Sequence, residues 1–335
     1  MKLATLDTYW GQRLAVVLGD YLVDLSAGHA ARLHQDQGEP RARAAARAAR
    51  EMPSDVHALL ESGPDALARA AALAAWLEAV SADDPERLAS FRWPVGQLPF
   101  APAVPRPSKI WCVGANYREH KREMAARSGT APPPDRLRGF LKPPSALIGP
   151  FDPIVLPPES QHVDHEIELG VVIGRRGRRI AEEAAMDHVA GYVVFNDVSS
   201  RDVPVLDQGR MDRGKGFDTF AVMGPWLVTK DEVPDPHHLA LGLRVNGELR
   251  QDGNTSDMVF GIEPQIAWLS AAMTLEPGDV LTTGTPSGVS PIAVGDVLEG
   301  WVERVGHHRN AVVAEPNADR IDPGRYGVPR AAPAR

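Results

Sequence analysis

The sequence contains one cysteine, Cys112, among its 335 residues. A single cysteine excludes an internal disulfide framework and fits a reducing compartment. Cys112 lies in the apolar run IWCVGA, where we expect a small buried hydrophobic side chain and not a nucleophile. No apolar run approaches the roughly 18–20 residues of a membrane span, and no basic segment followed by an apolar one opens the chain. These absences predict a cytoplasmic protein without a membrane partner.

Basic residues are in the minority, with 36 lysines and arginines against 44 aspartates and glutamates, a net charge of −8. No stripe of basic residues accompanies this balance, so nucleic acid is not expected as a partner. The arginines of residues 41–50 alternate with alanines, which is typical of a solvated helix face or loop. Charged residues make up 24% and hydrophobic residues 43%, as in an ordinary globular protein.

Two motifs of other enzyme classes are missing or broken. No G-x-S-x-G sequence occurs, so a serine hydrolase would lack its nucleophile elbow. Residues 209–215 read G-x-x-x-x-G-K, but Gly216 follows where a phosphate-binding loop needs Ser or Thr. The preceding segment is polar and does not form the apolar strand that such a loop requires. We therefore reject a nucleotide site at this position.

The pattern of prolines and short apolar runs predicts two domains. Strand-like runs open the chain and helical periodicity follows from Pro53 to Val80, which indicates a small α+β domain without a catalytic cluster. Beyond a proline-rich stretch, short strand-like runs alternate with turn residues, which predicts an antiparallel or mixed β architecture in an α+β, mainly β, protein. The predicted segments are an N-terminal domain (1–96), a stiff linker (97–108), a catalytic domain (109–315) and a mobile tail (316–335).

Three carboxylates occur in two apolar, strand-like runs. Alternation along a strand points Glu166 and Glu168 to one face, roughly 7 Å apart, and Asp197 ends a second apolar run. Buried charges need partners, because each costs several kcal/mol when unpaired. Mg²⁺ or Mn²⁺ would suit such oxygen ligands. From the spacing alone, a metal site and salt bridges to Arg175, Arg176 or Arg201 explain the carboxylates equally well.

Zinc is a weaker alternative at the same stretch. It would need His162 and His165 together with the glutamates. Strand alternation opposes this set, because His165 would face away from Glu166.

Further candidate residues lie on other segments. His120 and Glu123 are three residues apart, so on a helical turn the carboxylate could hold one imidazole nitrogen and leave the other as a general base. An ordinary exposed ion pair is the alternative. Lys215 lies between glycines that allow a close approach, and residues 282–288, TTGTPSG, form a turn suited to binding an anion.

In this order the fragments resemble the fumarylacetoacetate hydrolase superfamily, over residues 109–313 and about three fifths of the chain. The first hundred residues resemble the extra N-terminal domain of some members, including acylpyruvate hydrolase and oxaloacetate decarboxylase-like enzymes. The motifs that carry the resemblance are VGANYREHKREM, FLKPPSALIGP, VDHEIELGVVIG, GYVVFNDVSSRD, GKGFDTFAVMGPWLV, VNGELRQDGNTSDM, LEPGDVLTTGTPSGV and the closing Asn310.

The resemblance implies a mixed β-sandwich roll, a homodimer, and roles for individual residues. Mg²⁺ or Mn²⁺ would be held by Glu166, Glu168 and Asp197. The residues it implies for catalysis are His120, Glu123 and Lys215, and those it implies for the substrate are Arg201 and Thr285, with Thr219 near the metal. Pro204 departs from the family, where glutamine is frequent, and proline offers neither a side-chain amide nor a backbone donor. Gln208 is a candidate substitute in substrate binding.

These roles lead to a hypothesis about the reaction. A small 2-oxo or dioxo acid would be chelated by the metal, and cleavage of the neighbouring C–C bond would release an enolate stabilised by the cation and Lys215. We expect oxaloacetate-type decarboxylation, or hydrolysis of the acylpyruvate or fumarylacetoacetate type with His120 and Glu123 activating water. The alternatives are an oxo-acid isomerase, tautomerase or hydratase on the same site, or a catalytically impaired ligand-binding member.

Overall fold

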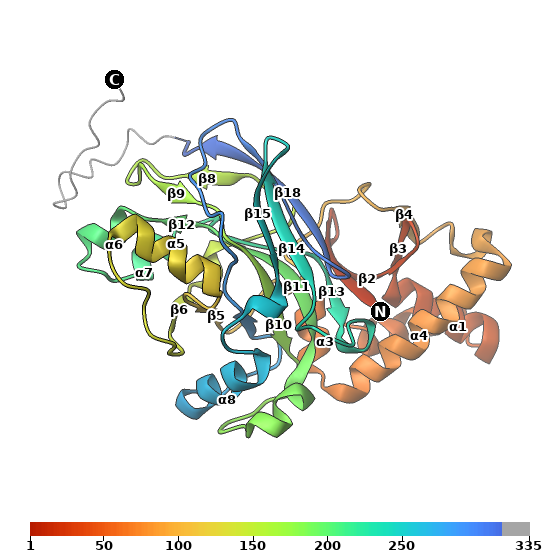
Figure 1. Ribbon diagram of the computed structural model, residues 1–335. Helices are drawn as coiled ribbons and strands as arrows, with labels where there is room; N and C mark the ends of the chain where they lie inside the picture. The colour runs from red at the N-terminus through yellow and green to blue at the C-terminus, as the bar shows by residue number, and fades with distance from the viewer. Residues whose placement is uncertain (317–335) are drawn as a thin grey trace.

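The computed structural model describes residues 1–316, whose strands form two main sheets and one short pair (Figure 1). Within these residues the large sheet has eleven strands in the order β4-β3-β2-β1-β13-β11-β10-β16-β5-β6, with β7 also paired to β13. These strands are β1 (Lys2–Thr8), β2 (Gly11–Leu18), β3 (Tyr21–Asp24), β4 (Arg92–Pro94), β5 (Ile110–Val113), β6 (Gly139–Lys142), β7 (Leu147–Ile148), β10 (Ile167–Ile173), β11 (Val189–Asp197), β13 (Ala221–Thr229) and β16 (Val280–Thr282).

The second sheet has five strands in the order β15-β14-β17-β18-β8. They are β8 (Ile154–Leu156), β14 (Ala240–Val245), β15 (Glu248–Asn254), β17 (Val297–Val302) and β18 (Gly306–Ala314), and the short pair is β9 (Val163–Asp164) with β12 (Ser199–Ser200). The α-helices are α1 (Leu25–Gln37), α2 (Arg41–Glu51), α3 (Val56–Glu61), α4 (Pro64–Asp83), α5 (Arg118–Ser128), α6 (Val203–Leu206), α7 (Asp212–Lys215) and α8 (Ile262–Ala272). None of the helices described is long and apolar enough to cross a membrane.

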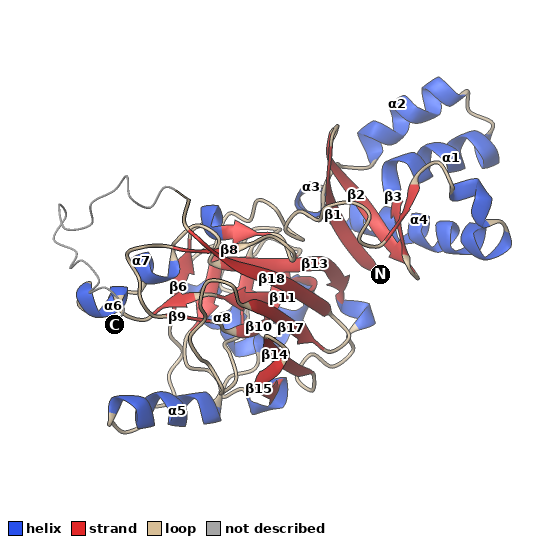
Figure 2. Cartoon of the chain, turned by 90° about the horizontal axis from the view of Figure 1, so that it is seen from above, coloured by secondary structure: helices blue, strands red, loops and turns tan. Residues whose placement is uncertain are grey.

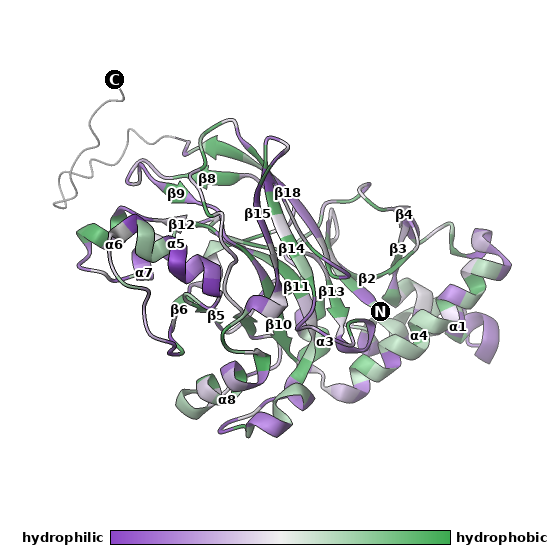
Figure 3. Ribbon diagram, viewed as in Figure 1, coloured by the Kyte–Doolittle hydropathy of each residue, from purple (hydrophilic) through white to green (hydrophobic). Residues whose placement is uncertain are grey.

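Two apolar cores cover the two faces of the large sheet. Alternate residues of β10, such as Ile167 and Leu169, pack against second-sheet residues such as Leu241 and Leu298. The opposite face, which includes Val172, packs against α3 and α4. All of β10 and β11 is therefore buried, as their hydrophobic colouring in Figure 3 reflects, whereas α5 is mostly hydrophilic. The mixed sheets and the helical N-terminal region confirm the predicted fold class.

The N-terminal segment continues the large sheet. Strand β1 pairs antiparallel with β13, in the register Lys2↔Val228, while α1, α2 and α4 gather beside β1–β3 (Figure 2). The predicted linker packs on β1, because Ala101 donates its backbone N–H to Thr5 O at 3.0 Å and the Thr5 hydroxyl donates to Ala103 O at 3.2 Å. The N-terminal strands β1–β4 and later strands of the chain thus share one sheet. The predicted tail lies outside the described residues apart from Pro316.

Local capping explains a helix that periodicity did not predict. The carboxylate of Asp24 accepts a hydrogen bond from Ala27 N at 2.9 Å and caps the start of α1, and Gly38 ends the helix with a φ of 67°. A tight Asn246-Gly247 turn joins β14 and β15, and both residues have a positive φ, which asparagine and glycine tolerate best.

A buried histidine in the second sheet predicts a pH-dependent stability. Burial lowers the pKa of His308 from 6.5 to about 4, against the hydrogen bond between its Nδ1 and Asn310 Oδ1. Below pH 6.5 His308 is therefore protonated in the unfolded chain, whereas in the folded chain it stays neutral down to about pH 4. This contribution to stability is complete above pH 6.5 and is lost as pH falls, by about 3 kcal/mol at pH 4.

Urea unfolding at pH 7.5 and pH 5 measures this contribution. We expect the free energy of unfolding to fall less between these two pH values in His308→Gln than in the wild-type protein. The matched control is His238→Gln, at an exposed position. Equal slopes in wild type and His308→Gln would contradict the assignment.

Candidate active site

The three predicted carboxylates lie together at one end of the large sheet. One oxygen from each of Glu166, Glu168 and Asp197 lies within 4.8 Å of the others, and all three residues are buried. Glu168 extends from β10 and Asp197 ends β11, while Glu166 directly precedes β10. The two glutamates share one face, as strand alternation predicts, and Asp197 joins them from the neighbouring strand β11.

Three cationic side chains surround two of these carboxylates. The Lys215 ammonium donates to Glu166 Oε2 and Asp197 Oδ2, at 2.7 Å each. Lys142 donates to Asp197 Oδ1 at 2.6 Å. Arg201 pairs with Glu166 and donates to Asp164 Oδ2 at 2.8 Å. Glu166 and Asp197 are thus neutralised within the chain.

These contacts set the charge states of the cluster. Burial alone would raise the pKa of Glu166, but the charges of Arg201 and Lys215 hold it below its usual range. Burial opposes the charged form of Lys215, yet Asp197 and Glu166 together raise its pKa. A charged ammonium therefore faces the carboxylates.

Glu168 has no such cationic partner. Its Oε2 accepts a hydrogen bond from Gly284 N at 2.8 Å, and in the described part of the chain no lysine, arginine or histidine forms an ion pair with it. Burial, then the charges of Asp197 and Glu166, raise the pKa of Glu168 well above its usual range. A buried carboxylate that lacks a counter-charge and faces two others fits a divalent cation, whose preferred ligands are oxygens.

His120 and Glu123 share a face of α5, as predicted. His120 Nδ1 lies 3.2 Å from Glu123 Oε2, and His120 is buried. Glu123 also binds Arg127 at 2.8 Å and accepts from Gly288 N at 3.2 Å. Burial would raise the pKa of Glu123, but His120 and Arg127 lower it. A carboxylate at Nδ1 leaves Nε2 of His120 as the unprotonated nitrogen.

A cavity of about 70 Å³ brings most of the predicted residues together. It is lined by the three carboxylates and by side chains from α5, α7 and the segment after β16. The predicted residues on its wall are His120, Glu166, Glu168, Asp197, Arg201, Lys215 and Thr285. Glu123 does not line the cavity itself but contacts His120, which does.

Gln208 and Thr219, which the sequence analysis named for the substrate and the metal, do not line this cavity. Gln208 has a φ of 58° and lies in a separate surface depression with Asp207 and Arg210. Thr219 accepts a hydrogen bond from Val155 N at 2.9 Å through its hydroxyl. The structure thus brings neither one to the carboxylates.

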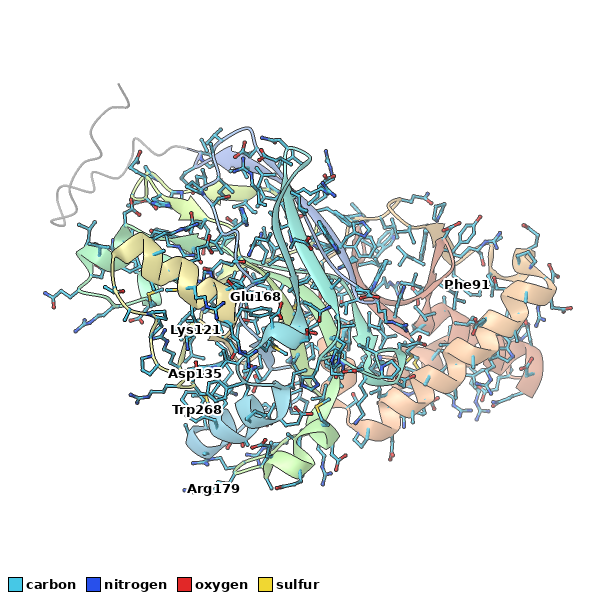
Figure 4. The ribbon with its side chains drawn as sticks, in the orientation of Figure 1. Phe91, Lys121, Asp135, Glu168, Arg179 and Trp268 are labelled. Carbon is cyan, nitrogen blue, oxygen red and sulfur yellow. The ribbon has the colours of Figure 1, made fainter. Side chains whose placement is uncertain are left out.

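Two of the alternative partners considered for the carboxylates, His165 and Arg176, contact other residues, whereas Arg201 does pair with one of the three. His165 points away, with Nδ1 2.8 Å from Gln251 Oε1 and Nε2 3.0 Å from Ser290 Oγ. Arg176 pairs with Glu276, and Arg179 in the same segment lies at the margin of the molecule, far from Glu168 (Figure 4). Arg201 pairs with Glu166 and also lines the cavity.

Sequence reasoning missed Lys142 and Asp164. Lys142 is buried in β6 and binds Asp197 and Val198 O, and Asp164 is buried beside Arg201. A lysine at the end of the short strand GFLK was the available signal for Lys142, because a charged group there needs a partner. Asp164 had the same signal as its neighbours, a carboxylate preceding an apolar strand.

Comparisons with known proteins extend over most of the chain. A profile described as "Fumarylacetoacetate (FAA) hydrolase C-terminal" matches residues 109–313. The mitochondrial oxaloacetate tautomerase FAHD2B of Bos taurus is 47% identical over 228 residues, which cover 66% of this chain and 71% of that protein. The mitochondrial oxaloacetate tautomerase FAHD2A of Homo sapiens is 46% identical over the same shares.

Solved structures show the same architecture. Maleylpyruvate hydrolase from Sphingobium sp. SYK-6, in complex with manganese(II) and pyruvate, superposes with a TM-score of 0.67 at 34% identity, covering 94% of this chain and 100% of that one. A 2-hydroxyhepta-2,4-diene-1,7-dioate isomerase from Mycobacterium marinum gives a TM-score of 0.67 at 29% identity, covering 95% and 100%.

Proposed function

Because the chain belongs to the fumarylacetoacetate hydrolase family, we propose that it is a divalent-metal-dependent enzyme that enolises a small 2-oxo acid. Keto–enol tautomerisation of an oxaloacetate-like dicarboxylate is the proposed reaction. One observation carries the proposal: a single small cavity combines a candidate cation site, the Lys215 ammonium and the His120–Glu123 pair. The oxaloacetate tautomerases at 46–47% identity support the choice of substrate.

The cation site supplies the first part of the chemistry. Glu166, Glu168 and Asp197 would hold Mg²⁺ or Mn²⁺, which polarises a 2-oxo group when bound. Manganese in the similar maleylpyruvate hydrolase supports this metal class. The small cavity favours a compact acid, and Arg201 at its wall offers a guanidinium to a carboxylate.

The chain's own residues would move the proton. Nε2 of His120 takes the proton from carbon 3 of the acid, while the electron pair of that C–H bond forms the C2–C3 double bond and negative charge moves to the 2-oxo oxygen. Glu123 holds Nδ1–H and supports the imidazolium that results. The Lys215 ammonium stabilises the developing oxygen charge. Return of the proton to that oxygen gives the enol.

C–C bond cleavage is the second candidate, and the similarity to maleylpyruvate hydrolase favours it. Hydrolysis needs an attacking water as well as the enolate. Pro204 is buried against Gly214 and does not line the cavity, so its side chain offers no polar group there to position such a water. Tautomerisation and decarboxylation need no such water, and both agree better with Pro204.

A substrate screen tests the proposal. Purified protein is incubated with oxaloacetate and with acylpyruvates, in Mg²⁺ or Mn²⁺ and again after EDTA, with products identified by NMR. The proposal predicts metal-dependent interconversion of the oxaloacetate tautomers. Acylpyruvate cleavage without tautomerisation would favour the second candidate, and activity that EDTA leaves unchanged would exclude both.

His120→Ala separates proton transfer from the other steps. We expect kcat for tautomerisation to fall by about 10²–10⁴, the usual contribution of a general base. Decarboxylation of the same acid should fall much less, since it needs no base. Steady-state kinetics of both reactions measure the ratio, with His238→Ala as the exposed control. Equal losses in the two reactions would count against this role for His120.

Two further properties belong to this proposal. A homodimer is proposed from the family resemblance, and size-exclusion chromatography with light scattering tests it. A cytoplasmic location is proposed from the single cysteine, although the oxaloacetate tautomerases compared above are mitochondrial.

A further inference from the structure

Strand β10, which carries candidate metal ligands, is not paired with β16 over its first residues, where those ligands lie. Strand β10 pairs with β16 from Gly170↔Thr282 onward, and Thr283 N still donates to Leu169 O at 3.1 Å. The chain then turns away at Gly284. On this edge the backbone N–H and C=O of Ile167, between Glu166 and Glu168, have no strand partner, and buried backbone groups need one.

Side chains replace the missing strand at Ile167. Ile167 N donates to Gln251 Oε1 at 3.1 Å, and the Thr285 hydroxyl donates to Ile167 O at 2.8 Å. Gln251 belongs to β15 of the second sheet and is 0% exposed. A residue of the second sheet therefore holds the backbone N–H of Ile167, the residue between the two glutamates.

The orientation of the Gln251 amide is fixed by its partners. Pro286 O can only accept and Ile167 N can only donate, so Nε2 faces Pro286, at 2.9 Å, and Oε1 faces Ile167. Nε2 then also donates to Thr285 Oγ1 at 2.8 Å, and Oε1 accepts from His165 Nδ1 at 2.8 Å. All four hydrogen-bonding positions of the amide are used.

We propose that Gln251 is a positioning residue of the active site, which holds Glu166 and Glu168 through Ile167 and holds Thr285 directly. A fully bonded, buried amide has one orientation, so the atoms it contacts are fixed with it. Without the amide, the backbone N–H of Ile167 and the Thr285 hydroxyl both lose the hydrogen bond that positions them. This inference rests on the metal site of the proposed function.

Mn²⁺ binding tests the inference without relying on turnover. Gln251→Met keeps the length and neutrality of the side chain but removes every hydrogen bond of the amide. In EDTA-stripped protein, measured by electron paramagnetic resonance, we expect the Mn²⁺ dissociation constant to rise about tenfold, at the low end of what outer partners of metal ligands contribute. Gln251→Asn, whose shorter amide cannot span Ile167 and Pro286, is measured in parallel in case Gln251→Met does not fold.

Gln265→Met is the matched control. Gln265 is also buried, and its amide donates to Phe260 O at 2.8 Å, a contact outside the metal ligands and Thr285. The Gln265→Met protein should have a lower free energy of unfolding, while its Mn²⁺ dissociation constant stays at the wild-type value.

A double-mutant cycle tests the link to Thr285. Gln251→Met should raise KM for oxaloacetate in the wild-type background and much less in Thr285→Val, because the hydroxyl it positions is already gone. Wild-type Mn²⁺ affinity in both Gln251 variants, or additive effects in the cycle, would overturn the inference alone. Wild-type protein that binds no Mn²⁺ would overturn the proposed metal site and this inference with it.

Discussion

Glu168→Gln should abolish stabilisation by Mn²⁺ while making the metal-free protein more stable. Glu168 is a buried carboxylate with two carboxylate neighbours and no ion-pair partner in the described residues. Glutamine keeps the shape and still accepts the Gly284 hydrogen bond, so removal of the charge should raise the free energy of unfolding by about 1–3 kcal/mol without metal. Loss of a ligand should weaken Mn²⁺ binding by more than the ~10–100-fold of an outer partner.

Urea unfolding of wild type and Glu168→Gln, each with EDTA and with Mn²⁺, measures both effects. Glu276→Gln is the control, because Glu276 pairs with the exposed Arg176 and is not one of the three clustered carboxylates. An ordinary structural carboxylate would give the opposite sign, with Glu168→Gln less stable under EDTA. Wild-type Mn²⁺ affinity in Glu168→Gln would remove Glu168 from the ligand set.

Lys215→Met should lower kcat by about 10²–10³, the loss seen when one donor to a developing oxyanion is removed. The same change should leave Glu166 and Asp197 without their shared ammonium, so the metal-free protein should lose about 3–5 kcal/mol of stability. Mn²⁺ should bind at least as tightly as in wild type, since the cluster becomes more negative. These results together would assign Lys215 to the reaction and not to the metal site.

Kinetics and Mn²⁺ titration of Lys215→Met separate these outcomes, with the exposed Lys230→Met as control. Measurements at saturating Mn²⁺ keep the variant folded, because a bound cation replaces part of the lost charge. A wild-type kcat at saturating Mn²⁺ would contradict the catalytic role of Lys215. Weaker Mn²⁺ binding would contradict the charge argument.

The grouping of Glu166 and Glu168 on one face was predictable because strand alternation is local. Glu166 and Glu168 are two residues apart, so the face they share follows from the backbone period alone. The same rule turned His165 to the opposite side, where Gln251 binds it. Spacing could not decide between cation and salt bridge, and the structure contains both kinds of environment: Arg201 pairs with Glu166, while Glu168 has no such partner.

The rest depended on contacts between distant segments. Lys142 reaches Asp197 from β6, and nothing in the short run GFLK indicates which carboxylate it meets. The pairing of β1 with β13 joins the first and the middle parts of the chain, so strand patterns alone placed a boundary where the sheet is continuous. In the sequence, Gln251 is one of several polar residues that follow a hairpin turn. Only its burial in the structure distinguishes it from these neighbours.

The central claim is that a divalent cation held by Glu166, Glu168 and Asp197 is required for enolisation of a 2-oxo acid. It is tested most directly by adding Mn²⁺ stepwise to EDTA-stripped protein while the enol absorbance of oxaloacetate is followed. The account predicts no catalysis above the spontaneous rate without metal, and activity that rises to a plateau at one Mn²⁺ per chain. Full tautomerase activity in the stripped protein, or activity that Mn²⁺ does not restore, would contradict it.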